Sequence, residues 1–185
     1  MARLYTYGKL NRIINKPGQN ALPGTYTSAQ GVQFAQGAFK TTADAIEFGE
    51  VVELVSENAK GLGIKRATAS LTANTAVIVV RDLVGVRTIQ AGIAETVGDG
   101  VPFSAIKANS AHAWDIVVPV VAGETPAVGG AVYVGLGTNG TVLGGIYDSA
   151  QGAGGVDSIA LTGWTFKSTT FTPTSSASIC AVIGK

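Results

Sequence analysis

The residues that could carry catalytic chemistry gather around the only histidine. His112 lies three residues before Asp115 and near Ser104 and Ser110, so a Ser-His-Asp triad can be drawn from these residue types. Such a triad depends on geometry, and the chain has no Gly-x-Ser-x-Gly segment that would present a nucleophilic serine. We therefore expect His112 to be a surface or loop histidine and the protein not to be an enzyme.

Two further patterns also favour a structural interpretation. Cys180 is the only cysteine and sits in an apolar segment, which predicts a buried, inert thiol and excludes a disulfide framework or a cysteine zinc site. Gly135, Gly137 and Gly140 spell Gly-x-Gly-x-x-Gly, but strand-like residues follow instead of the helix that would receive a dinucleotide phosphate. We expect no cofactor and no metal ion.

A run of acidic residues follows the first forty residues of the chain. Its members are Asp44, Glu47, Glu50, Glu53 and Glu57. No Asp-x-Asp-x-Asp-Gly loop accompanies them, so a solvated face is favoured over a calcium site.

Composition narrows the class of function. The 185 residues carry a net charge of +1, and only 14% of them are charged. Nucleic acid and anionic membranes require clustered positive charge, so we expect neither as a partner. The longest uncharged stretch, 125–147, is too rich in glycine for a membrane helix. The mean hydropathy of +0.32 suggests that other subunits or a larger partner cover part of the apolar surface.

The elements that must position these residues are strands. Alternating and β-branched runs recur from residue 42 onward, with glycine-rich turns between them. Asn139-Gly140 between two apolar runs predicts a β-hairpin, and Pro119 predicts a sheet edge or a bulge. Short helical turns are expected only within 41–48 and 104–113. The predicted fold is mainly β, a compact β-barrel, β-tulip-like or sandwich domain with an extended N-terminal arm.

The arm is predicted to comprise residues 1–41 and the β-domain residues 42–185. Residues 1–40 carry five basic and no acidic side chains, with apolar residues spaced between them. A disordered terminus and an arm that orders on a partner both fit this pattern. The candidate partner-binding residues of the arm are Arg3, Leu4, Tyr5, Tyr7, Lys9, Leu10, Arg12, Ile13, Ile14 and Lys16. Its basic residues could also meet acidic surface on a neighbouring subunit.

Four apolar segments carry a resemblance to a known family. They are 45–52 (Ala-Ile-Glu-Phe-Gly-Glu-Val-Val), 75–82 (Thr-Ala-Val-Ile-Val-Val-Arg-Asp), 129–134 with the turn 138–141 (Gly-Gly-Ala-Val-Tyr-Val and Thr-Asn-Gly-Thr), and 179–183 (Ile-Cys-Ala-Val-Ile). These segments resemble the decoration, or structural cement, proteins of tailed-bacteriophage capsids. The resemblance extends loosely over 42–185, and the stretches 98–113 and 167–178 have no counterpart in it.

The resemblance implies a function without catalysis or cofactor. Such proteins sit on the outer surface of the virion capsid, often as homotrimers, and clamp neighbouring copies of the major capsid protein. The expected partners are therefore the major capsid protein and the chain itself, after synthesis in the host cytoplasm. A tail-tube, baseplate or other virion β-protein is the alternative, and a small β-barrel enzyme or ligand-binding domain is a third hypothesis.

Overall fold

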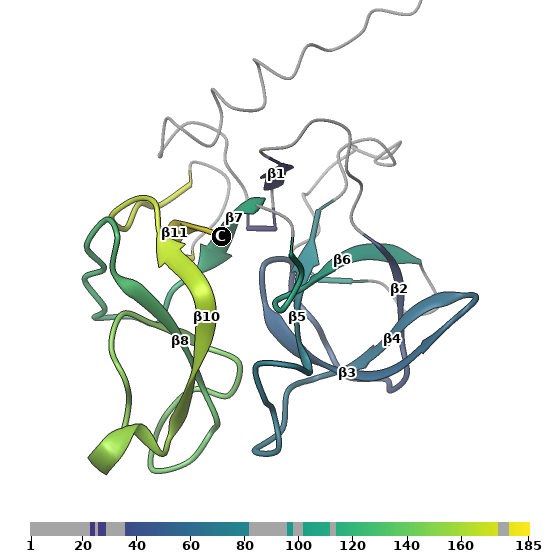
Figure 1. Cartoon of the computed structure of the whole chain (residues 1–185), viewed down its shortest axis with the longest axis horizontal. Coiled ribbons are helices and arrows are strands. Elements are labelled where there is room, and N and C mark those ends of the chain that lie inside the picture. Colours follow the sequence, from purple (N-terminus) through teal and green to yellow (C-terminus); the bar gives the residue numbers. More distant parts are fainter. Residues whose placement is uncertain are drawn as a thin grey trace, which may run out of the picture.

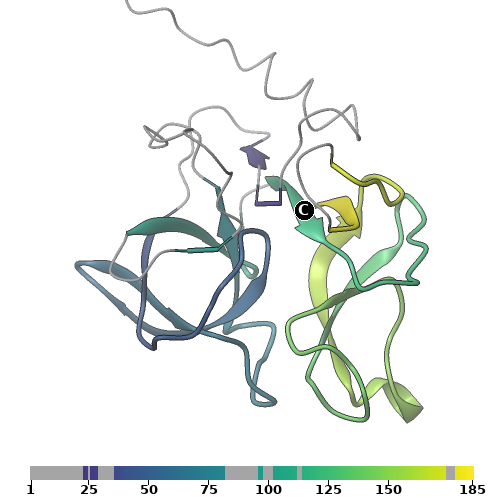
Figure 2. The same ribbon diagram turned by 180° about the vertical axis from the view of Figure 1, so that it is seen from behind.

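The computed structural model describes residues 23–24, 26–28, 36–81, 96–97, 102–111, 114–173 and 178–185. This part of the chain is mainly β, with two sheets side by side (Figures 1 and 2). The predicted mainly β fold with a β-barrel is confirmed, whereas most of the predicted extended arm, residues 1–41, lies outside the described residues.

The first sheet is a closed five-stranded barrel with the order β2-β4-β3-β5-β6. Its strands are β2 (Gln36–Lys40), β3 (Val51–Asn58), β4 (Gly61–Lys65), β5 (Ala76–Val80) and β6 (Phe103–Lys107). Closure occurs where β2 pairs in parallel with β4 and antiparallel with β6. The other pairs are antiparallel. Closure leaves the barrel strands without a free edge.

The second sheet has six strands in the order β1-β7-β11-β10-β8-β9, all antiparallel. Its strands are β1 (Tyr26–Ser28), β7 (Trp114–Pro119), β8 (Ala131–Gly135), β9 (Ile146–Tyr147), β10 (Ser158–Phe166) and β11 (Cys180–Gly184), and the 3-10 turn η1 (Ala153–Gly155) precedes β10. A parallel bridge from Val120 to Ile146 joins β9 to the residue after β7. The sheet therefore curls back on itself.

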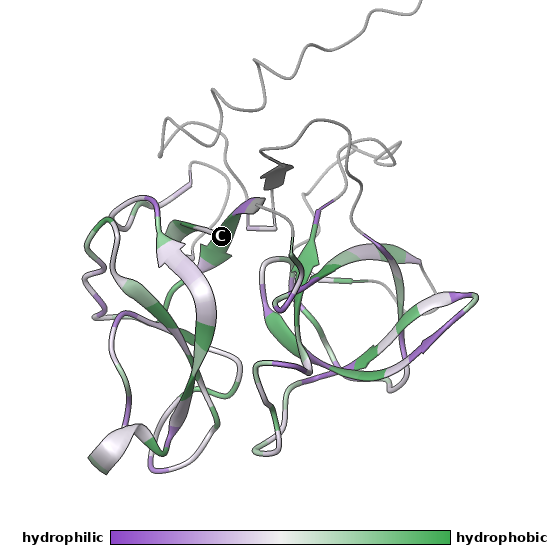
Figure 3. Ribbon diagram, viewed as in Figure 1, coloured by the Kyte–Doolittle hydropathy of each residue, from purple (hydrophilic) through white to green (hydrophobic). Residues whose placement is uncertain are grey.

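One apolar core joins the two sheets, and a second core fills the barrel. Strand β5 is buried on both faces because its side chains alternate between the two cores. Val77 and Val79 point into the barrel interior. Ile78 and Val80 pack with residues of the second sheet, among them Trp164. Hydrophobic colouring follows the strands in Figure 3, whereas the hairpin tip between β3 and β4 is hydrophilic.

The predicted hairpin at Asn139-Gly140 is confirmed. Strands β8 and β9 pair antiparallel, and the Thr141 amide donates to the Thr138 carbonyl (2.9 Å) to close the turn. Asn139 and Gly140 both have positive φ, 47° and 87°, which is what a type I′ turn requires. Pro119 is the last residue of β7 and pairs with Cys180 of β11. Strand β1 pairs only with residues 114–116 of β7, so the pairing with β1 does not require an amide hydrogen at Pro119.

Two other expectations differ from the structure. The helical turn expected within 104–113 is wrong, because residues 104–107 pair with β5 and β2 as part of β6. Within 41–48 the chain forms bends and an isolated bridge from Glu47 to Thr96. Strands β1 and β2 lie inside the range 1–41 that was assigned to the arm, and β2 is a barrel strand. Strand β2 buries only Ala38 fully, which explains why no periodicity marked it.

Candidate functional site: the root of the N-terminal arm

The predicted site residues fall largely outside the described part of the chain. All ten candidate partner-binding residues of the arm lie there, and so does His112. Asp115 lies in β7, where burial raises the pKa of its carboxyl although the charge of Lys167 acts in the opposite direction. Cys180 is a buried thiol, as predicted.

The first described residues of the chain form a buried junction between the two sheets. Pro23 and Gly24 are buried, and hydrogen bonds place Gly24 between the second sheet and the barrel. The Gly24 amide donates to the Val117 carbonyl of β7 at 2.8 Å, and the Gly24 carbonyl accepts from the Arg81 amide, just after β5, at 2.7 Å. We call Pro23, Gly24, Phe48, Gly49 and Arg81 the arm root. A single residue of the arm root thus ties both sheets together.

Two glycines make this close approach possible. Gly24 has φ of 80°, and a Cβ there would lie 2.9 Å from both the Arg81 nitrogen and the Phe48 Cβ. Gly49 has φ of 85°, and its Cβ would lie 2.9 Å from the Gly24 nitrogen and from Pro119 Cδ. A side chain at either position would therefore collide with the backbone of the segment that faces it. Each glycine also has a positive φ, which disfavours residues with a side chain.

Arg81 closes the arm root. Its side chain is only 7% exposed, and its Nε donates to the Pro23 carbonyl at 3.3 Å. The guanidinium carbon lies 4.3 Å from the centroid of the Phe48 ring, a cation–π distance. Desolvation makes these contacts stronger than they would be at the surface. Pro23-Gly24 is a typical turn pair, but nothing in the sequence links it to residues 48–49 or 81.

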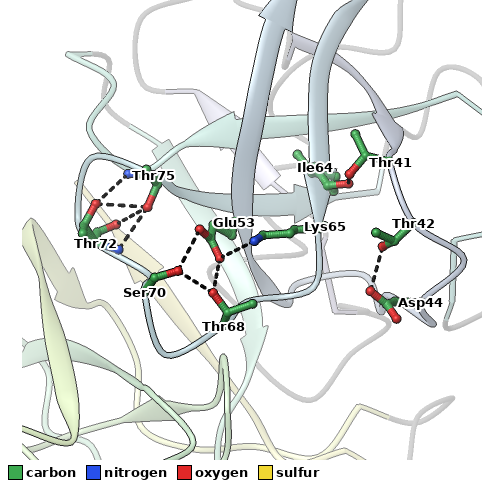
Figure 4. A network of polar contacts seen from close by, with 10 residues as sticks. All are labelled: Thr41, Thr42, Asp44, Glu53, Ile64, Lys65, Thr68, Ser70, Thr72 and Thr75. Carbon is green, nitrogen blue, oxygen red and sulfur yellow. Dashed lines mark hydrogen bonds and ion pairs between the residues drawn. The ribbon is translucent and has the colours of Figure 1, made fainter.

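The acidic run is not the uniform solvated face that was expected. Glu53 is only 8% exposed and accepts hydrogen bonds from Thr68 Oγ1 (2.5 Å) and Ser70 Oγ (3.3 Å), with Lys65 Nζ at 3.4 Å (Figure 4). These partners satisfy the buried carboxylate, as burial of a charge requires. The arrangement ties the loop between β4 and β5 to strand β3.

Glu50 is a partly buried member of the acidic run. Its carboxylate accepts from the Glu47 amide at 2.9 Å and lies 3.7 Å from Arg66 Nε. Burial nevertheless raises the pKa of Glu50, outweighing the hydrogen bond from the Glu47 amide and the charge of Arg66, which both lower it. Glu50 directly follows Gly49 of the arm root, so protonation of Glu50 changes the charge next to the arm root.

Two loops of the second sheet are held by carboxylates. The Asp148 amide donates to Glu124 Oε2 at 3.0 Å, and the Thr125 amide donates to Asp148 Oδ2 at 2.9 Å. Burial raises the pKa of Glu124, and the neighbouring Asp148 carboxylate adds to this effect. The described residues contain no group of three or more histidine, cysteine, aspartate or glutamate side chains that could hold a metal ion.

The comparisons with known proteins supply no relative. No protein-family model, no curated protein and no solved structure matches the chain. Among the described residues, no helix has the length and apolar character needed to cross a membrane.

Proposed function

We propose that this protein is a non-catalytic capsid decoration protein that binds the outside of a tailed-phage head and stabilises contacts between major capsid proteins. The arm root is the observation that carries this proposal. The arm is joined to a buried junction that both sheets share, through the Gly24 hydrogen bonds to Val117 and Arg81. A partner bound by residues 1–22 would therefore be attached to the barrel and the second sheet through Gly24.

The charge and apolar pattern of residues 1–22 supports binding to a partner. This segment carries Arg3, Lys9, Arg12 and Lys16 with no acidic residue. An arm that orders on a capsid surface loses conformational entropy. Apolar anchors such as Leu4, Tyr5 and Ile13 offset that loss by burial, at about 25 cal/mol per Å² of apolar surface. Repetition over a lattice multiplies modest affinities, since each bound subunit holds its neighbours in place.

The experiment that tests the proposal is capsid binding by the full chain and by a variant lacking residues 1–22. The deletion stops before Pro23, so it keeps the arm root, β1 and β2. Deletion of residues 1–41 would instead remove the strand that closes the barrel. We expect the short deletion to weaken sedimentation with capsids while leaving the thermal unfolding midpoint nearly unchanged. Undiminished binding would contradict the role of the arm.

A matched control separates charge from folding. One variant replaces Arg3 and Lys9 of the N-terminal segment by glutamate, and the other replaces Lys40 and Lys60 of the barrel. Lys65 and Lys107 are kept, because they pair with Glu53 and Glu57. The proposal expects the arm variant to lose capsid binding more strongly than the barrel variant. The solution mass should lie near three times 18.7 kDa for a preassembled trimer. A hexameric ring would favour a tail-tube protein.

A further inference from the structure

Asn139-Gly140 is the only Asn-Gly pair in the chain, and it forms the tip of the hairpin between β8 and β9. Asn139 is exposed, and a Cβ on Gly140 would find open space within 4 Å. An asparagine followed by glycine is chemically labile, because the glycine backbone nitrogen can reach the asparagine side-chain carbonyl without steric hindrance from a side chain. The hairpin tip thus presents an asparagine side-chain amide that can be hydrolysed.

A carboxylate from another loop holds the amide of this asparagine. Asn139 Nδ2 donates to Asp157 Oδ1 at 2.9 Å and to Oδ2 at 3.1 Å. Thr138 Oγ1 donates to Asp157 Oδ1 at 2.5 Å. Asp157 is only 4% exposed, and the hydrogen bonds from Thr138 and Asn139 lower the pKa of its carboxyl. The ionised Asp157 carboxylate therefore holds the side-chain amide of Asn139 in place at neutral pH.

Backbone hydrogen bonds extend this contact into a clamp between two loops. The Leu136 amide donates to the Asp157 carbonyl at 2.9 Å, and the Asp157 amide donates to the Gln151 carbonyl at 3.1 Å. A Cβ on Gly152 would also collide with the Asp157 carboxylate. We call this contact, between residues 136–141 and 151–157, the hairpin clamp. Whether the hairpin clamp holds depends on position 139, which can either donate hydrogen bonds to Asp157 as asparagine or face it with a second negative charge as aspartate.

We propose that Asn139 is a deamidation site that Asp157 protects, and that its reaction converts the hairpin clamp from a hydrogen-bonded pair into a pair of like charges. In the first step the Gly140 nitrogen bonds to Asn139 Cγ, the Cγ–Nδ2 bond breaks, and the proton of the Gly140 amide leaves with Nδ2 as ammonia. Water then opens the succinimide at either carbonyl and leaves aspartate or isoaspartate at position 139. No oxidant, reductant or enzyme is required.

The structure assigns Asp157 two opposite effects in this reaction. Before the reaction it restrains the Asn139 side chain and slows attack by the Gly140 nitrogen. After the reaction its carboxylate faces a second carboxylate in place of two N–H donors, so the clamp loses its hydrogen bonds and gains a repulsion. The change runs in one direction only. It is independent of the proposed function, although a long-lived particle would accumulate it.

The rate is tested by incubating the purified full-length chain at mild alkaline pH and following the gain of about one mass unit in the peptide that contains position 139. The isosteric variant Asp157→Asn should deamidate at residue 139 faster by about tenfold, the rate equivalent of one charge-assisted hydrogen bond. Thr138→Val is the matched control. It removes the other side-chain donor to Asp157 but keeps both Asn139 bonds, and should react close to the rate of the unsubstituted chain.

Equal rates in the unsubstituted chain and Asp157→Asn would overturn the protective role. So would a rate in the folded chain as fast as that of a synthetic peptide of residues 135–145. Faster deamidation in Thr138→Val than in Asp157→Asn would also overturn it, since general loosening of the loops would then be the cause.

The consequence for the hairpin clamp is tested with the product residue itself. Asn139→Asp should lower the unfolding midpoint by about 2–4 °C, the shift that one lost hydrogen bond causes in a chain of this size. It should also speed proteolysis within residues 149–157. The double variant Asn139→Asp, Asp157→Asn again pairs one amide with one carboxylate, now with their positions exchanged. It should recover both the unfolding midpoint and the resistance to proteolysis. An unchanged midpoint in Asn139→Asp, or no recovery in the double variant, would refute the like-charge account.

Discussion

Replacing Gly24 by alanine tests the arm root most sharply among single substitutions. The new Cβ would lie 2.9 Å from the Arg81 nitrogen and from Phe48 Cβ, with 3.1 Å to the Gly49 nitrogen. Two of these three atoms belong to the backbone, so relief requires the barrel and the second sheet to shift. The positive φ of 80° costs about 1–2 kcal/mol for a residue with a side chain, and overpacking adds about 1–3 kcal/mol. We expect Gly24→Ala to lower the free energy of unfolding by about 2–5 kcal/mol.

The assay is urea unfolding followed by tryptophan fluorescence, to which the buried Trp164 contributes. Gly123→Ala is the matched control, since Gly123 also has positive φ, 96°, but a Cβ there would meet nothing within 4 Å. It should cost only the conformational part, about 1–2 kcal/mol. If Gly24→Ala destabilises the chain no more than Gly123→Ala does, the close approach at the arm root is not a tight contact and the argument fails.

Three further predictions concern buried polar groups. Arg81→Met should lower the free energy of unfolding by about 1–3 kcal/mol, because the Pro23 carbonyl loses its side-chain donor; a loss within error in urea unfolding would contradict this. Burial raises the pKa of Glu50 in the folded chain, so the folded state binds the extra proton and stability falls as pH rises from the ordinary glutamate range through the raised value. Glu50→Gln should remove that fall in thermal unfolding measured across the acidic range, and identical pH profiles would refute the assignment. Trp164→Phe should cost about 2–3 kcal/mol, because the indole Nε1–H donates to the Ala108 carbonyl at 2.8 Å in the core between the sheets; calorimetry measures it, and a neutral effect would contradict the buried hydrogen bond.

Local patterns in the sequence predicted the features of the fold that depend on neighbouring residues. The Asn139-Gly140 turn was visible because both residues tolerate positive φ and apolar runs flank them. Strand β5 was visible as a β-branched run, but its burial on both faces by two different cores is a tertiary property. Glu53 was assigned to a solvated face because its satisfying partners, Thr68 and Ser70, lie on the loop after β4 and do not share a periodic pattern with it.

The arm root could not be derived from the sequence for a related reason. Its contacts join residues 23–24, 48–49 and 81, which lie far apart in the sequence and share no periodic pattern. A glycine forced by a close approach looks like any turn glycine until the neighbouring backbone is known. Strand β2 escaped notice because only Ala38 of its five residues is fully buried.

Binding to capsids is decided by co-sedimentation of the purified chain, with and without residues 1–22, with shells assembled from the major capsid protein of the same genome. The account predicts that the full chain saturates the shells and raises the temperature at which they open. It also predicts that the variant lacking residues 1–22 remains folded but binds far less. If the full chain stays in the supernatant with intact shells, the protein is not a capsid decoration protein.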